Sequence, residues 1–259
     1  EGNVYYPYNN YVFTENNNGK VVVPAIAVAD VGKTMNITAE NLTLAVDGGI
    51  SVYRNNNVTI DSKAVTINTE KDKAITSTAG SLGIKGDLTI NGTGKGIVAE
   101  RAYNGNDVSQ AARQAYVTVD GKTVINTTGT AIEAIGADIN LKDEASLSAN
   151  SDTVIVKVGE GKLSDYWYEP KVSVLNMVGG SITATSGNAL IVEGGTANLN
   201  ADGGKDLSIT GDITLKTGIT ADDYGYEYGT QSFGSTANIK LDTSDSSWTG
   251  SLMNDGNTM

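Results

Sequence analysis

The sequence repeats a short pattern in which two apolar residues flank one small polar residue. Examples are Met35-Asn36-Ile37, Leu42-Thr43-Leu44 and Ile50-Ser51-Val52, and the next series begins at Val58. Alternation with a period of two is typical of a short β-strand with one buried face, and the Gly, Asn and Asp residues between triplets favour tight turns. The chain is therefore expected to be all-β.

The triplets group in threes, and the groups recur at a nearly constant spacing. The first strand of each group begins near one of these residues: Met35, Val58, Leu82, Val117, Ile139, Val172, Ala197 and Ile239. The successive intervals are 23, 24, 35, 22, 33, 25 and 42 residues. The short intervals predict a parallel β-solenoid of about eight coils with three strands per coil. A sandwich or barrel is the rival fold, but it would need longer strands in hairpin order.

The three long intervals contain insertions, and each follows the third strand of a group. They span 101–114, 159–170 and 221–234. Insertions at one corner of a solenoid usually mark its functional face. Many of the aromatic residues lie there, and we predict that they contact a ligand: Tyr103, Tyr166, Trp167, Tyr168, Tyr224, Tyr226, Tyr228 and Phe233. The alternative is that these rings fold back and cover the solenoid.

Residues 1–33 differ from the repeat in composition and in hydrophobic pattern. A tyrosine-rich start is followed by Asn18-Gly19, a dipeptide that favours a tight hairpin turn, and then by the apolar run Val21–Val28. We predict an N-terminal β-hairpin cap over the first coil, with residues 34–259 forming the solenoid.

The central residue of each triplet is expected to point outward and to stack on its equivalent in the next coil. On the first strand these residues are Asn36, Thr59, Gly83, Thr118, Asn140, Ser173 and Asn198, and on the second they are Thr43, Thr66, Thr89, Ser146, Thr183 and Ser208. Flat ladders of hydroxyls and amides could meet their own copy on another molecule. The members predicted for self-association are Thr43, Thr59, Thr66, Thr89, Thr118, Asn140, Thr183 and Asn198. The simpler interpretation is that Thr and Asn are soluble residues that strands tolerate.

Composition excludes several functions. The chain has no Cys and no His, so thiol nucleophiles, structural zinc and Ser-His-Asp catalysis are ruled out. With 30 acidic and 18 basic residues, its net charge of −12 disfavours nucleic acid and anionic membranes as partners. No run of 18 apolar residues predicts a transmembrane helix, so no membrane insertion is expected.

Enzymatic and metal sites are also not expected. The acidic pairs Asp143-Glu144 and Asp222-Asp223 and the nearby Asp202 and Asp206 do not recur at one coil interval, whereas a lyase or glycoside hydrolase needs converging carboxylates. The stretch 203–207 (Gly-Gly-Lys-Asp-Leu) matches a calcium-binding repeat only once and in part. We therefore predict no enzymatic activity, no metal and no cofactor.

The threonine- and asparagine-rich triplets resemble the passengers of autotransporters (type V secretion) from Gram-negative bacteria. The phrase Ser246-Ser247-Trp248-Thr249-Gly250-Ser251 is similar to one in their late coils. The resemblance covers roughly 34–252 and implies a right-handed parallel β-helix, exposed on the bacterial surface or secreted. It also implies a tether through a C-terminal translocator barrel, which this sequence lacks.

Together these features predict a non-enzymatic adhesin whose partner is a second copy of itself, a host-surface glycan or a host protein. Two alternatives stay open. One is a polysaccharide-degrading β-helix enzyme, and the other is a stalk that only holds another domain away from the cell.

Overall fold

The computed structural model describes residues 15–17, 20–22, 24–28, 32–45, 48–70, 72–101, 114–159, 162–164, 167–168, 170–220 and 230–259. Within these ranges all regular secondary structure is β-strand, and no helix there is long and apolar enough to cross a membrane. Most strands join one large parallel sheet. The prediction of an all-β, parallel fold is confirmed.

The sheet has three faces, which we call A, B and C. Face A contains the first halves of β4 (Thr34–Ala45) and β6 (Asn57–Thr69), then β8 (Ser81–Ile84), β11 (Ala115–Val119), β14 (Ala137–Leu141), β19 (Val174–Met177), β21 (Thr196–Leu199) and β25 (Thr236–Ile239). Face B contains the second halves of β4 and β6, then β9 (Asp87–Gly92), β12 (Thr123–Thr127), β15 (Ala145–Ala149), the first halves of β20 (Gly180–Glu193) and β22 (Leu207–Lys216), and β26 (Ser247–Thr249).

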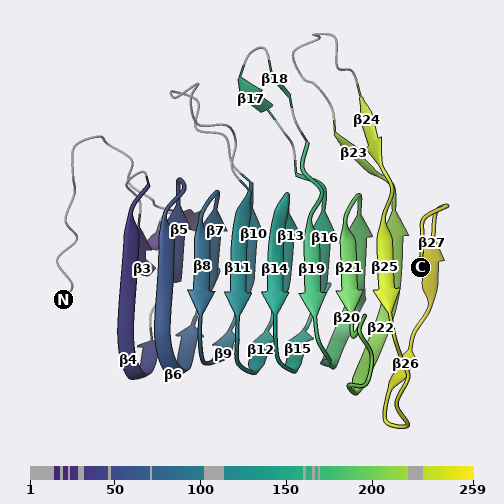
Figure 1. Ribbon diagram of the computed structural model, residues 1–259, viewed down its shortest axis with the longest axis horizontal. Helices are drawn as coiled ribbons and strands as arrows, with labels where there is room; N and C mark the ends of the chain where they lie inside the picture. Colours follow the sequence, from purple (N-terminus) through teal and green to yellow (C-terminus); the bar gives the residue numbers. More distant parts are fainter. Residues whose placement is uncertain are drawn as a thin grey trace.

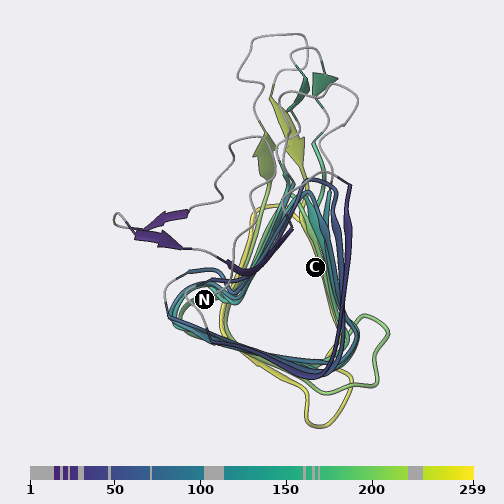
Figure 2. The same cartoon turned by 90° about the vertical axis from the view of Figure 1, so that its left-hand side faces the viewer.

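Face C contains β3 (Pro24–Val28), β5 (Gly48–Tyr53), β7 (Ile75–Thr78), β10 (Ile97–Glu100), β13 (Ile132–Ile135), β16 (Val154–Lys157), the second halves of β20 and β22, and β27 (Leu252–Asn254). The chain visits A, B and C in order and then repeats, and each strand pairs in parallel with its equivalent one turn later. Figure 1 shows the turns side by side, and Figure 2, viewed along the stack, shows them superposed in one three-sided outline. This arrangement is consistent with a β-helix or solenoid.

Apolar side chains fill the interior because alternate residues of each strand point inward. The first-strand positions Val58, Leu82, Val117 and Ile139 are at most 1% exposed and continue into the next turns. The next members are Leu175 and, near the C-terminal end, Ala237. The sequence analysis had placed Val172 and Ile239 at these two positions, and both placements were wrong.

The misplacement near Val172 has a physical cause. Ser173 looked like an outward triplet centre, but its side chain is buried, where its hydroxyl accepts a hydrogen bond from the Ala137 N–H at 3.1 Å and donates one to the Lys157 carbonyl. A polar residue that satisfies two backbone groups can be buried at little cost. The alternation therefore continues through the corner, and the strand starts later than its pattern indicates.

The insertions lie after strands of face C and before strands of face A. In the second insertion, β17 (Lys162–Ser164) and β18 (Trp167–Tyr168) pair antiparallel. At the third insertion, β23 (Gly218–Thr220), which lies just before it, pairs antiparallel with β24 (Gln231–Phe233). Both hairpins project from the edge between faces C and A (Figure 1). The first insertion is described only at Arg101 and Gln114.

The N-terminal segment contains an antiparallel strand pair. β1 (Glu15–Asn17) and β2 (Lys20–Val22) pair antiparallel, with Asn17 opposite Lys20 across Asn18-Gly19. β3, also within residues 1–33, instead joins face C in parallel register with β5. The parallel sheet therefore already includes residues assigned to the expected cap.

Candidate functional site

Face A carries a continuous row of outward, uncharged residues, which we call ladder A. Its members follow one another in strand register: Asn36, Thr59, Gly83, Thr118, Asn140, Asn176, Asn198 and Asn238. Thr59, Thr118, Asn140 and Asn198 thus lie where the sequence analysis placed them. Asn176 takes the place expected for Ser173, and Asn238 extends the row.

The asparagines of ladder A hydrogen-bond to one another along the stack. The Nδ2 atoms of Asn176, Asn198 and Asn238 donate to the Oδ1 atom of the preceding asparagine, each at 2.7 Å, starting from Asn140. A carboxamide has two N–H donors and two acceptor lone pairs. An interior member such as Asn176 uses one of each in the ladder, so the other N–H and lone pair are available on the outer side.

Face B carries two such rows. Ladder B1 contains Thr43, Thr66, Thr89, Val124, Ser146, Ser181, Ser208 and Ser247, and ladder B2 contains Ala45, Asn68, Asn91, Asn126, Ser148, Thr183, Thr210 and Thr249. Thr183 was expected in register with Ser146, but Ser181 is there and Thr183 lies in the neighbouring row. In B2, the Asn91 Nδ2 atom donates to Asn68 Oδ1 at 3.1 Å. No member of the three ladders is charged.

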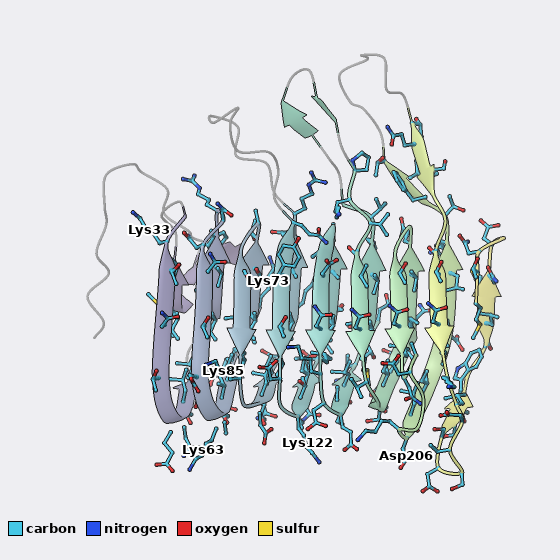
Figure 3. All side chains as sticks on the ribbon, viewed as in Figure 1. Lys33, Lys63, Lys73, Lys85, Lys122 and Asp206 are labelled. Atoms are coloured by element: carbon cyan, nitrogen blue, oxygen red, sulfur yellow. The ribbon has the colours of Figure 1, made fainter. Side chains whose placement is uncertain are left out.

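Charged residues gather instead where faces A and B meet. Ion pairs join successive turns there, with Lys63 Nζ 2.9 Å from Glu40 and Lys85 Nζ 2.7 Å from Asp61. Hydrogen bonding and charge attraction from Asp61 raise the pKa of Lys85 above its ordinary value. Figure 3 shows Lys63, Lys85 and Lys122 towards this edge. Exposed pairs of this kind add little stability.

The aromatic residues predicted to bind a ligand are only partly placed. Tyr103, Tyr166, Tyr224, Tyr226 and Tyr228 lie outside the described residues. The backbones of Trp167 and Tyr168 form β18. Phe233 is half-buried in β24, opposite Gly218.

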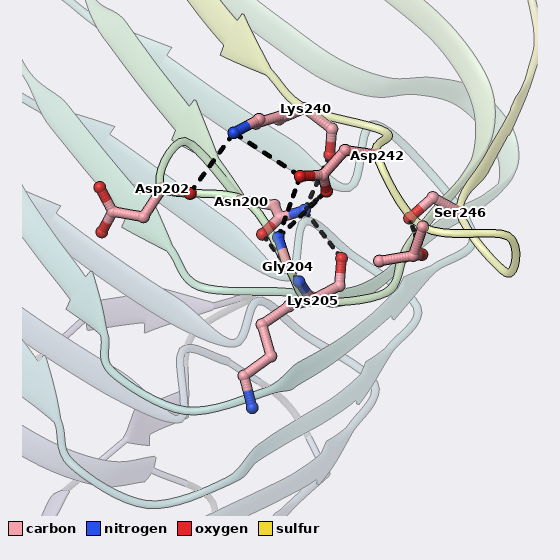
Figure 4. Close-up of polar contacts among 8 residues, drawn as sticks. Asn200, Asp202, Gly204, Lys205, Lys240, Asp242 and Ser246 are labelled. Carbon is pink, nitrogen blue, oxygen red and sulfur yellow. Dashed lines mark hydrogen bonds and ion pairs between the residues drawn. The ribbon is translucent and has the colours of Figure 1, made fainter.

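The partial calcium-like stretch at 203–207 belongs to a self-contained turn cluster (Figure 4). Both oxygens of the Asp242 carboxylate accept from the Gly204 N–H at 3.1 Å, and Asn200 Nδ2 donates to Oδ1 at 3.3 Å. The Gly204 N–H is the main reason that the pKa of Asp242 is lowered, with Lys240, 3.6 Å away, adding to the effect. This carboxylate is already bound by its own chain. Among the described residues no group of three or more acidic side chains is placed to hold a metal ion.

A pocket at the edge between faces C and A was missed by the sequence analysis. It encloses about 440 Å³ and is lined by Asn55, Asn56, Asn57, Ala79, Gly80, Ser81, Gln114 and Tyr116. The run of three asparagines at 55–57 was an available signal, since polar residues at a solenoid corner can line a ligand site. Gln114 gave no signal, because it is the last residue of the first insertion and belongs to no repeat.

No protein-family model, no curated protein and no solved structure matches this chain. The chemistry of the ladders and of the corner pocket therefore carries the functional assignment.

Proposed function

We propose that the chain is the passenger segment of a bacterial autotransporter, a non-enzymatic adhesin exposed on the cell surface or secreted, which binds copies of itself. Its fold would be a right-handed parallel β-helix of about eight coils with an N-terminal cap. The observation that carries the proposal is the set of three ladders, A, B1 and B2, which extend from β4 to the last turns without a charged residue.

Association would use the hydrogen-bonding capacity that the ladders leave unused. Each asparagine within a ladder retains an N–H and a lone pair, and each threonine or serine retains part of its hydroxyl capacity. One such bond contributes only about 1 kcal/mol after loss of bound water. A second copy aligned along the rod forms many at once, because every turn repeats the same spacing of about 4.8 Å.

Sedimentation velocity across a range of concentrations tests the proposal. The wild-type protein is expected to associate as its concentration rises, and a Thr43→Lys, Thr66→Lys, Thr89→Lys variant is expected to stay monomeric because it places three ammonium groups on ladder B1. A matched control places three lysines elsewhere on exposed positions, at Ser232, Ser244 and Thr258. If the ladder variant associates as strongly as the wild type, face B is not the contact.

A second binding mode, to a host glycan or protein, is supported by the two antiparallel hairpins that project from one edge. Aromatic rings there would supply stiff, amphipathic contact area. Trp167→Ala is then expected to weaken binding of a confirmed ligand by about 2 kcal/mol without changing thermal stability. Equal affinity of the variant and the wild type would remove Trp167 from the site.

A further inference from the structure

The corner pocket is formed by equivalent residues of successive turns. Asn57, Ser81 and Tyr116 follow one another in register on face A, and Gln114 precedes the last of these strands. Tyr116 is 44% exposed, and in the two preceding turns its position holds the smaller polar residues Asn57 and Ser81. The described lining contains amides, a hydroxyl and a phenol but no charged side chain. Its volume of about 440 Å³ is within the range of small-molecule sites.

The wall of the pocket has an unusual backbone. Asn55 and Ala79 line it with φ angles of 63° and 51°, and Arg54 beside them has a φ of 51°. Left-handed backbone is costly for Ala and Arg, and strained residues of this kind concentrate at functional sites. Backbone hydrogen bonds hold them, including one from the Asn55 N–H to the Ala79 carbonyl at 2.5 Å. The wall is therefore preorganised before any ligand arrives.

Asn56 fixes the base of the pocket. Its side chain is fully buried, where Oδ1 accepts from the Lys33 N–H at 2.7 Å and Nδ2 donates to the Val28 carbonyl at 2.9 Å. It is a structural residue, and its neighbours Asn55 and Asn57 are positioned by it.

Two buried polar atoms beside the pocket have no hydrogen-bond partner. The Tyr116 O–H lies 3.2 Å from Gln114 Oε1 and donates to it, while Gln114 Nε2 has no acceptor. On the adjoining strand, opposite Tyr116, Asp138 Oδ1 has no donor. Burial raises the pKa of Asp138, and Lys171, the Val174 N–H and the Gln114 side-chain amide oppose this rise in part. The Gln114 amide therefore faces the Asp138 carboxyl, and because Nε2 carries two N–H groups, one of them is left for a ligand hydroxyl.

We propose that this pocket binds one sugar residue of an uncharged glycan, with Tyr116 as the aromatic contact and Gln114 as a hydrogen-bond donor to a sugar hydroxyl. A charged sugar would find no counter-charge among the lining residues, and an apolar ligand could not accept a hydrogen bond from the Gln114 amide. This ligand class would specify what the proposed adhesin binds. Sugar binding by the pocket can be tested by itself, and only its biological role rests on the proposed function.

The test is a titration of the monomeric protein, at concentrations below any association, with glucose, galactose, N-acetylglucosamine and lactose. Calorimetry gives the affinity, and ¹⁵N NMR follows the Gln114 side-chain amide. We expect saturable binding of at least one sugar and a chemical-shift change of the Gln114 side-chain amide. In the Gln114→Leu and Tyr116→Ala variants, the affinity for that sugar should fall by about tenfold or more. Thr236→Ala, in the same row at the far end of face A, is the control and should bind normally.

Binding that is absent for all four sugars, or unchanged in both pocket variants, would overturn the proposal. Stronger binding of glucuronic acid than of glucose would overturn the neutral ligand class. Circular dichroism and thermal melts show whether each variant is folded, and the NMR shift in the wild type does not depend on any variant. The triple lysine variant on ladder B1 should still bind sugar, so failure of self-association and failure of sugar binding are separate results.

Discussion

Asp138 is the described carboxylate whose charge burial disfavours most clearly. Desolvation raises its pKa, whereas Lys171, the Val174 N–H and Gln114 lower it in part. A carboxyl group with a folded-state pKa above its unfolded value destabilises the protein once the pH exceeds the unfolded value, and this cost is complete above the folded value. Below both values the carboxyl is neutral in both states and the cost disappears.

We therefore expect Asp138→Asn to raise the free energy of unfolding at pH 7 by up to about 1 kcal/mol, because the side chain is only half-buried. The gain should shrink as the pH falls towards 3, and urea unfolding at several pH values measures it. Asp245→Asn, at an exposed turn residue, is the control. A gain that is equal at pH 3 and pH 7 would mean that packing, and not charge, distinguishes the two side chains.

The asparagine hydrogen bonds of ladder A, which join β14, β19, β21 and β25, are expected to contribute to the free energy of unfolding. Asn176 is half-buried within the ladder and joins two hydrogen bonds, whereas Asn238 lies at its end and joins one. Asn176→Ala should therefore lower the free energy of unfolding by about 1–2 kcal/mol, and Asn238→Ala by about half as much. Chemical denaturation of the two variants provides the comparison. If both substitutions cost the same, the amides are equally well solvated and the ladder adds no stability.

Strand periodicity was enough to predict the all-β parallel sheet and the members of ladder A up to Asn140. It failed where a polar residue is buried, because Ser173 satisfies two backbone groups and thereby hides the true phase of the strand. It failed again at Thr183, since Ser181-Ile182-Thr183 places a polar residue on either side of the buried Ile182, which is 0% exposed. The pocket could not be predicted, since it depends on the left-handed backbone at 54–55 and 79 and on Gln114, the last residue of an insertion.

At the scale of the whole molecule, each turn contacts only its neighbours, so the two ends differ from the middle. Ile37, Leu42 and Leu44 of β4 are only partly buried, whereas the equivalent residues of β6, namely Ile60, Val65 and Ile67, are 0% exposed. At the C-terminal end, Leu252 and Met253 are 44% and 61% exposed. The middle turns therefore hold the flat faces in a fixed geometry. Contact between two copies along the rod is expected to depend more on the middle turns than on the end turns.

Repulsion between the net charges of two molecules determines how self-association of the protein should depend on salt concentration. Two molecules that each carry a net charge of −12 repel one another, whereas the ladders that would meet are neutral. Salt shortens the range of the repulsion from about 30 Å at 0.01 M to about 10 Å at 0.1 M and hardly affects hydrogen bonds between neutral groups. Sedimentation velocity should thus show stronger association of the wild type as sodium chloride rises over that range. Association that weakens instead would mean that ion pairs between copies hold the contact, formed by edge residues such as Lys63 and Glu40, and that the neutral ladders do not.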